Sequence, residues 1–505
     1  MPPIDVDVVI VGAGLSGIGA AAHLTRECPR KSYLVLEGRE AVGGTWDLFR
    51  YPGIRSDSDM YTLGYSFKPW RRHNSIADGA EILDYIDETA REYGVYGRIR
   101  FGHRVTRAEW SSVDSAWTVS VDRASAGGRV ERTQVRCRFL FLCCGYYDYE
   151  TPFEPEFEGA EEFAGRIVHP QFWTDDIDYA GKRVVVIGSG ATAVTLVPSL
   201  AERAAHVTML QRSPSYVVSL PASDPFARLV NRLLPPRAAY AVIRWKNVLV
   251  AMAFFKLSRR RPGLVRRFVR EGVRRNLPDG FDVDTHFNPS YDPWDQRVCL
   301  VPNSDLFRAL SRGTASVVTD RIERFDRDGI VLASGGRIDA DVIVTATGLN
   351  LIPFGNAELL VDGRPMPVAE RFAYRGSMLS GIPNAIFASG YTNASWTLKC
   401  DLTLSYACRL INHMDARGYA ACAPTAPGGL ESVPFLDLRS GYVMRAVDRF
   451  PKQGDRAPWR LDQNYLKDIR TLRRTELEDG VLRFYREGEP IDEPRPATPA
   501  PPVAA

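Results

Sequence analysis

The sequence predicts an α/β fold built from two similar βαβ units and a helical insertion. The first unit opens with the apolar run 6–11, continues through a small-residue helix at about 16–26 and returns at 32–36. The second opens at 183–187 and returns at 206–210. In each unit a glycine-rich loop follows the first strand, where a helix N-terminus can hold a pyrophosphate. These observations predict two dinucleotide-binding (Rossmann-like) domains.

Two more apolar strands end in glycine, at 139–145 and 341–348, and mark where the chain is expected to cross between the domains. The Arg-rich stretch between the second βαβ unit and the later strand has a helical pattern and predicts an insertion. The predicted division is 1–150 with 350–487 for the first domain, 151–349 for the second, about 223–289 for the helical insertion and 488–505 for a Pro- and Ala-rich disordered tail.

Composition narrows the possible functions. The 505 residues, 45% hydrophobic and 25% charged, suit a globular protein of two or three domains. A formal net charge of only +3 gives no sign of a nucleic-acid partner, and the eight cysteines show no metal-ligand spacing. The N-terminus leads directly into a strand, and the apolar run 248–255 is too short to span a bilayer, so we expect a cytoplasmic protein.

The first glycine loop has the full context of a dinucleotide site. Gly12 permits the tight turn, Gly14 lets the backbone approach a pyrophosphate, and Gly17 lets the helix pack on the strand. Glu37 ends the second strand, where a carboxylate accepts hydrogen bonds from ribose hydroxyls. The alternative is a structural turn with a surface glutamate.

The second loop favours a different nucleotide. Gly188 and Gly190 repeat the pattern with Ala193 in the third place, and Arg212 follows the strand that corresponds to the one before Glu37. A guanidinium there would bind a 2′-phosphate, which predicts NADPH rather than NADH. The alternative is that Arg212 is a solvated surface charge. The residues expected to contact NADPH here are Gly188, Ser189, Gly190, Ala191, Thr192, Ala193, Arg212 and Ser213.

A fingerprint of spaced residues lies between the loops. Phe163, Gly165, His169 and Trp173 match FxGxxxHxxxW, and Thr174 stands where Pro or Asp is usual. By this motif the chain resembles the Baeyer–Villiger and related class B flavin monooxygenases. In that position at the crossover, His169 is either part of a domain hinge or a packed structural residue.

A second motif of the same family, [A/G]GxWxxxx[F/Y]P[G/M]xxxD, is matched across 43–57. The runs 43–61, 293–297 and 390–397 are similar to mycobacterial members of this family, and the similarity extends to about residue 485. The resemblance implies FAD and NADPH as cofactors, O2 as co-substrate, and conversion of ketones to esters through a C4a-peroxyflavin. It also implies oxidation of sulfides and thioamides.

The resemblance also assigns site residues. Arg297 would stabilise the anionic oxygen at the flavin, unless it is only a structural partner of Asp292 or Asp295. Arg55 and Ser56 would reach the nicotinamide, and Asp57 and Arg55 join Arg297 as catalytic candidates. The expected FAD contacts are Gly12, Gly14, Ser16, Gly17, Glu37, Gly44, Thr45, Trp46, Asp47, Leu48, Asp57 and Val105.

Other functions stay open on the sequence alone. An N- or S-oxygenating flavin monooxygenase shares both loops, and a non-enzymatic flavin redox sensor would bind the same cofactor. A disulfide reductase would carry a spaced cysteine pair near the flavin, whereas Cys143 and Cys144 are adjacent. The basic stretch 259–275, just after 248–255, is either a solvated helical face or a peripheral membrane contact.

Overall fold

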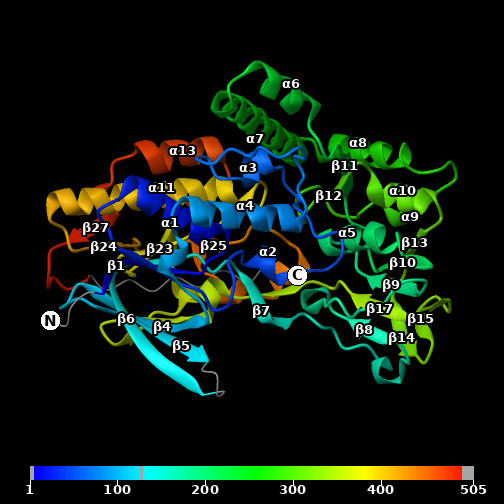
Figure 1. Cartoon of the computed structure of the whole chain (residues 1–505), viewed down its shortest axis with the longest axis horizontal. Coiled ribbons are helices and arrows are strands. Elements are labelled where there is room, and N and C mark those ends of the chain that lie inside the picture. Colours follow the sequence, from blue (N-terminus) through cyan, green and yellow to red (C-terminus); the bar gives the residue numbers. More distant parts are fainter. Residues whose placement is uncertain (1–4, 125–128, 492–505) are drawn as a thin grey trace.

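The structure, a computed structural model, describes residues 5–124 and 129–491. The predicted α/β class is confirmed: two sheets with a parallel core lie side by side, and helices pack on both (Figure 1). Most of the predicted disordered tail, from residue 492 onward, lies outside the described residues.

The larger sheet is centred on the first predicted strand. β1 (Val6–Val11) pairs in parallel with β2 (Tyr33–Leu36) on one side and β6 (Val130–Leu142) on the other. Its side chains alternate, so Val8 and Ile10 face the helices α1 and α11 while Val9 and Val11 face the opposite core. The other strands of this sheet are β3 (Ile99–Arg100), β4 (His103–Ser111), β5 (Ala116–Ala124), β19 (Glu358–Val361), β20 (Arg364–Pro365) and β23 (Ala385–Phe387).

Helices of this region cover the sheet on the face of Val8 and Ile10. α1 (Leu15–Glu27) packs against α11 (Trp396–Arg417), although almost 370 residues separate the end of α1 from the start of α11 in the chain. Small residues along α1, Gly17, Gly19, Ala20, Ala21 and Ala22, are buried and permit the close approach. The further helices here are α2 (Thr45–Leu48), α3 (Met60–Leu63), α4 (Gly79–Glu92) and α13 (Tyr465–Arg474), whereas α12 (Gly441–Met444) packs its Val443 into the core on the opposite face.

The second sheet is wholly parallel, in the order β13-β10-β9-β17-β8. Val184, Val186 and Val344 fill its core, as expected for strands covered on both faces. Its elements are β8 (Arg166–Val168), β9 (Arg183–Ile187), α5 (Ala191–Leu200), β10 (His206–Gln211), α10 (Asp305–Ser311), β13 (Ala315–Thr319) and β17 (Val342–Thr345).

Two chain segments connect the sheets, and they pair with each other. β7 (Tyr147–Pro152) leaves the first sheet and β18 (Leu349–Leu351) returns to it, and the two form an antiparallel ribbon. This ribbon lies at the expected crossovers near 150 and 350. A paired double connection restricts how far the two sheets can rotate relative to one another.

Helices form most of the predicted insertion: α6 (Pro225–Leu233), α7 (Pro236–Arg260), α8 (Pro262–Arg274) and α9 (Val283–His286). The first two project from the body along its upper edge (Figure 1). By length and composition α7 could cross a membrane, a possibility that the short run 248–255 did not suggest, and 28% of its apolar window is buried. Its buried Ile243 and Arg244 attach it to the rest of the fold.

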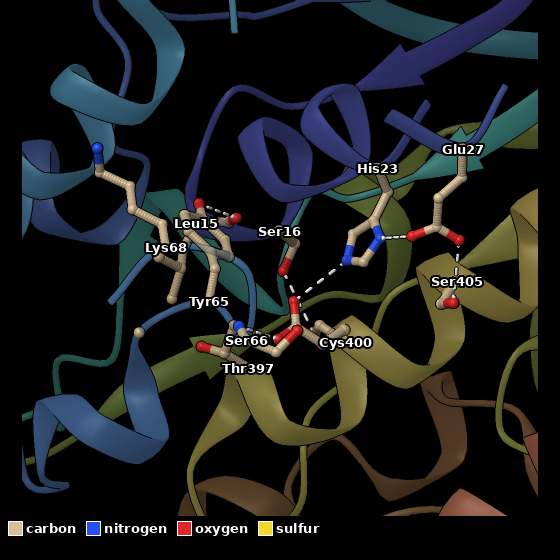
Figure 2. A network of polar contacts seen from close by, with 12 residues as sticks. Leu15, Ser16, His23, Glu27, Tyr65, Ser66, Lys68, Thr397, Cys400 and Ser405 are labelled. Atoms are coloured by element: carbon tan, nitrogen blue, oxygen red, sulfur yellow. Dashed lines mark hydrogen bonds and ion pairs between the residues drawn. The ribbon is translucent and has the colours of Figure 1, made fainter. Parts of the chain in front are cut away.

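Arg244 belongs to a buried polar network that joins distant segments. On α11, Asp401 accepts hydrogen bonds from the backbone N–H of Ser66 (2.6 Å) and from Arg244 (3.4 Å), and contacts His23 on α1 (3.3 Å). His23 also bonds Glu27 at 2.7 Å (Figure 2). Arg244 donates to the carbonyls of Tyr61 and Gly64, each at 2.8 Å. The network therefore fixes the insertion to the first sheet's helices.

Stability should fall in alkaline solution because of His23. Burial alone would lower the pKa of His23, but Asp401 and Glu27 raise it to about 9, above the ordinary 6.5. A group whose pKa is raised by folding stabilises the fold fully below its unfolded pKa and loses that contribution as the pH rises through the folded value. We expect the Tm to decline between about pH 6.5 and 9, and this part of the decline to be missing in His23→Gln. Parallel Tm curves for the two proteins would contradict this assignment.

Candidate active site

One cavity of about 1560 Å³ is lined by residues of both sheets and the insertion. That is larger than a pocket for one drug-sized ligand and gives room for a dinucleotide together with a substrate. The predicted site residues that line it are Gly12, Gly14, Ser16, Glu37, Gly44, Thr45, Trp46, Arg55, Ser56, Asp57, Val105, Ala191, Thr192 and Arg297.

Two glycine segments meet at the floor of the cavity. Gly12 has φ +101°, and a Cβ on it would lie 2.8 Å from the carbonyl oxygen of Cys143. A Cβ on Gly17 would lie 1.8 Å from the carbonyl oxygen of Gly12, so the helix can approach the strand only without a side chain there. Gly44 packs on Gly14, with 3.1 Å between a would-be Cβ and the Cα. The backbone is therefore exposed to the cavity where a pyrophosphate needs close approach.

Glu37 shapes this loop from the end of β2. Its Oε2 accepts from the N–H of Ala13 at 2.6 Å and its Oε1 from the N–H of Arg39 at 2.8 Å. Burial raises the pKa of Glu37 above its ordinary value, because these bonds only partly offset the lost hydration. The carboxylate lines the cavity while it holds the loop, which fits its predicted place beside a ribose.

Ser16 is held from the far end of the chain. Trp396, the first residue of α11, donates its indole N–H to Ser16 Oγ at 2.8 Å, and Cys400 Sγ lies 3.6 Å from the same oxygen (Figure 2 shows Ser16 and Cys400). Gly390 permits this position, since a Cβ there would lie 2.4 Å from the Trp396 ring. The N-terminus of α1 is thus set by contacts across about 380 residues.

Arg297 pairs with Asp57, and not with the neighbours considered from the sequence. Its Nη1 donates to Asp57 Oδ2 at 2.6 Å. Asp292 pairs instead with Arg266 at 3.0 Å, and Asp295 pairs with Arg259 at 2.7 Å. The alternative that Arg297 is only a structural partner of Asp292 or Asp295 is therefore excluded.

The guanidinium stays charged in the cavity. Burial alone would lower the pKa of Arg297, but Asp57 and the hydroxyls of three nearby tyrosines, Tyr442, Tyr146 and Tyr147, raise it above its ordinary value. Its Nε is buried without a hydrogen-bond partner among the described residues. A fixed cation with an unused donor is therefore present at the wall of the cavity.

The segment around Asp57 bridges the two sheets. Gly53 has φ +78°, and a Cβ there would meet the Ser199 hydroxyl on α5 at 1.9 Å. Arg55 donates to Asp305 at the start of α10 (2.5 Å) and to the carbonyl of Val194 (3.5 Å). Arg55 is therefore bound to the second sheet's helices. The predicted contact between Arg55 and a nicotinamide would be made by a side chain that these helices hold in place.

The second glycine loop has the predicted form, although most of it lies outside the cavity. Gly188 has φ +139°, a Cβ on it would lie 2.4 Å from the carbonyl of Ala346, and Gly190 caps α5. Ser189 Oγ donates to the carbonyl of Ser213 at 2.9 Å, and the neighbouring Arg212 is exposed. The predicted residues that do not line the cavity are Gly17, Asp47, Leu48, Gly188, Ser189, Gly190, Ala193, Arg212 and Ser213.

Asp47 and Leu48 lie beside the cavity without lining it. Asp47 is buried and pairs with Arg39 (2.5 Å) and Arg50 (3.0 Å). Leu48 packs against the core of the second sheet. Asp47 therefore stabilises the Gly43–Trp46 turn through its two arginines.

None of the fingerprint residues lines the cavity, and of the four His169 lies beside the crossover. His169 Nδ1 accepts from the N–H of Gln171 (3.2 Å), so its Nε2 carries the proton and donates to the carbonyl of Gly348 (3.3 Å). Burial lowers the pKa of His169 and favours this neutral form. His169 thus ties the end of β8 to Gly348, just before the connecting strand β18, while Phe163, Gly165 and Trp173 pack within the second sheet's cores.

The sequence did not predict the aromatic wall of the cavity. Tyr146, Tyr147 and Tyr149 line the cavity from the start of β7, and Tyr149 Oη lies 3.2 Å from Thr45 Oγ1. The signal was the run Tyr146-Tyr147-Asp148-Tyr149, placed directly after the glycine of the expected crossover.

Comparisons with known proteins agree with this arrangement. A family model described as "Pyridine nucleotide-disulphide oxidoreductase" matches residues 9–230. The eight cysteines, all within the described residues, are free, so no redox disulfide accompanies that match. Among solved structures, an oxidised steroid monooxygenase bound to NADP has a TM-score of 0.69 at 27% identity, covering 83% of this chain and 87% of that one.

Curated relatives are closer. The FAD-containing monooxygenase EthA of Mycobacterium tuberculosis (strain H37Rv) is 53% identical over 487 residues, covering 96% of this chain and 99% of the relative. The putative FAD-containing monooxygenase MymA of the same strain is 50% identical over 484 residues, covering 95% and 97%. These matches confirm the resemblance read from the two motifs, including its mycobacterial character. The chain therefore belongs to the family of FAD-containing monooxygenases.

Proposed function

We propose that this monooxygenase is of Baeyer–Villiger type and uses NADPH and O2 to convert a ketone into an ester. The balanced reaction consumes ketone, O2, NADPH and H⁺ and yields ester, NADP⁺ and water. The observation that carries the proposal is the charged Arg297, paired with Asp57 in a cavity shared by both sheets. Product analysis with a ketone and a sulfide tests it.

The cofactors would divide between the two sheets. FAD would lie along Gly12–Ser16, Glu37, Gly44–Trp46 and Val105, all of which line the cavity. NADPH would approach from α5, where Ala191 and Thr192 line the cavity. We accordingly propose 1–150 with 350–487 as the FAD domain and 151–349 as the NADPH domain.

When bound, FAD accepts a hydride from NADPH and activates O2. The chain's own contribution is electrostatic. In this role Arg297, whose side chain is 32% exposed in the open cavity, would stabilise negative charge on the reacting oxygen and on the oxyanion of the ketone adduct once the bound cofactors and substrate displace water around it. Asp57 holds the guanidinium in place through the 2.6 Å bond.

Arg212 should set the preference for NADPH. It is exposed beside Ser213 at the end of β10, free to meet a 2′-phosphate. A charge-assisted bidentate contact contributes substantially to the free energy of binding. Arg212→Ala should therefore lower kcat/KM for NADPH roughly 10- to 100-fold and leave kcat/KM for NADH nearly unchanged. Arg312→Ala, which removes an exposed arginine at the end of α10, is the control. An unchanged NADPH/NADH ratio in Arg212→Ala would show that another residue reads the phosphate.

Sulfides and thioamides are proposed as further substrates. Their sulfur atoms are readily oxidised, so an activated oxygen in this cavity could be transferred to sulfur as well as to a ketone. An enzyme that oxidises only nitrogen or sulfur is the second candidate, and it predicts sulfoxide without ester. A redox sensor predicts neither product.

We also propose a cytoplasmic location with peripheral contact at the membrane. Residues 259–275 are strongly basic, and the segment 248–255 before them is apolar and largely accessible on α7. Anionic lipid attracts such a segment.

A further inference from the structure

The apolar side chains left exposed on the insertion fall into stripes. On α6 these are Phe226, Leu229 and Leu233, spaced by three and four residues, with Leu233 70% exposed. Such spacing places them on one helix face. The stripes continue on the next two helices, as Val242, Trp245 and Leu249 on α7 and Leu264 and Phe268 on α8. A soluble helix does not ordinarily leave an apolar face uncovered.

The charge of this region is of one sign. Residues 225–270 contain no Asp or Glu. Seven exposed cations on these helices and their connections form no ion pair with the described residues: Arg228, Arg232, Arg237, Lys256, Arg260, Arg261 and Arg267. A second copy presenting the same face would be repelled, whereas an anionic lipid surface would be attracted by both the charge and the apolar stripes.

The cavity opens onto the same face. α7 lines it with residues 250–256, and the exposed side chains of Val250 (60%), Phe268 (68%) and Leu220 (44%) form part of its wall. Cavity residues that are this accessible mark an opening to the surface. The rim is therefore apolar and adjoins the stripes on α7 and α8.

We propose that the face of α6, α7 and α8 docks on an anionic lipid bilayer, so that the cavity opens toward the lipid and takes apolar ketones from it. The identity of the substrate in this proposal rests on the proposed ketone oxidation, whereas the membrane contact does not. α7 lies on the bilayer surface and does not cross it, because Arg244 is fixed inside the fold by Asp401 and the carbonyls of Tyr61 and Gly64.

Binding is tested on the intact protein with FAD. The wild type should co-sediment with vesicles of phosphatidylcholine mixed with phosphatidylglycerol, and much less with phosphatidylcholine alone. Leu233→Glu with Leu249→Glu should weaken this binding about tenfold or more, since neither residue lines the cavity and both would carry a charge into the interface. Val113→Glu is the control away from this face, a side chain as exposed as Leu233 (70%) in the turn between β4 and β5.

A local signal identifies the docking face. Trp245 is 43% exposed on the stripe, so lipids brominated on their acyl chains should quench its fluorescence, and Trp245→Phe should lose that quenching. If vesicles bind the wild type and the double variant equally, or quenching is unchanged in Trp245→Phe, the proposed face is wrong. Self-association of the wild type that the double variant abolishes would instead assign the face to a second copy.

Turnover separates the two proposals. The double variant should oxidise water-soluble cyclohexanone like the wild type but lose rate on an apolar ketone dissolved in the vesicles. Equal rates on the vesicle ketone would contradict lipid-phase entry. Absence of ester from both ketones with the wild type would contradict the proposed function and leave the vesicle-binding result standing.

Discussion

Arg297→Ala will retain FAD and lose ester formation. FAD stays bound because the loops of Gly12–Ser16 and Gly43–Trp46 are built by backbone contacts that do not involve Arg297. Ester formation is lost because, among the described residues, Arg297 is the cation that pairs with Asp57, and losing one such electrostatic group lowers kcat by roughly 100- to 1000-fold. The measurements are flavin absorbance of the purified variant and ester yield from a ketone.

Two companion variants sharpen this result. Arg297→Lys keeps the charge but not the planar fork, so it should recover part of the rate. Arg266→Ala breaks a comparable arginine–aspartate pair with Asp292 outside the cavity and should leave turnover unchanged. Ester formation in Arg297→Ala at the wild-type rate would refute the role given to this arginine.

Asp401→Asn will destabilise the fold more than any surface change. The carboxylate is 2% exposed and faces two buried cations, Arg244 and protonated His23, while it also accepts the N–H of Ser66. Removing one partner leaves buried charge uncompensated, at a cost of about 3–5 kcal/mol. Thermal or denaturant unfolding measures the loss. The insertion should loosen first, because its anchor Arg244 loses its only acidic partner among the described residues.

The matched control lies on the same helix. Asp415 pairs with Lys31 at 2.8 Å on α11 but is 44% exposed, so Asp415→Asn should cost about 0–1 kcal/mol. Similar losses for the two variants would mean that the Asp401 network is not a principal tie between the insertion and the helices α1 and α11.

Local sequence patterns were enough to predict the fold class and the two glycine loops. Gly12 and Gly17 sit where a strand, a turn and a helix follow one another, and these relations are set within a few residues. The helical insertion and the crossovers were predicted for the same reason, since apolar strands ending in glycine and helical periodicity are local signals.

Contacts that join distant segments could not be predicted in this way. Asp57 and Arg297 are 240 residues apart, and the sequence offered Asp292 and Asp295 as nearer partners for the arginine. Likewise nothing near Ser16 indicates that Trp396 will hold its hydroxyl. Such pairs are decided by how the sheets and the insertion pack. That packing also leaves Arg212 exposed outside the cavity that Arg297 lines.

The most direct test of the proposed function follows the oxygen atoms. The purified flavoprotein is supplied with NADPH, ¹⁸O2 and a panel of ketones, and products are analysed by mass spectrometry. We expect an ester carrying one labelled oxygen, with NADPH consumed in step with product. Consumption of NADPH that yields only hydrogen peroxide, or a sulfoxide from an added sulfide but no ester from any ketone, would contradict the Baeyer–Villiger assignment.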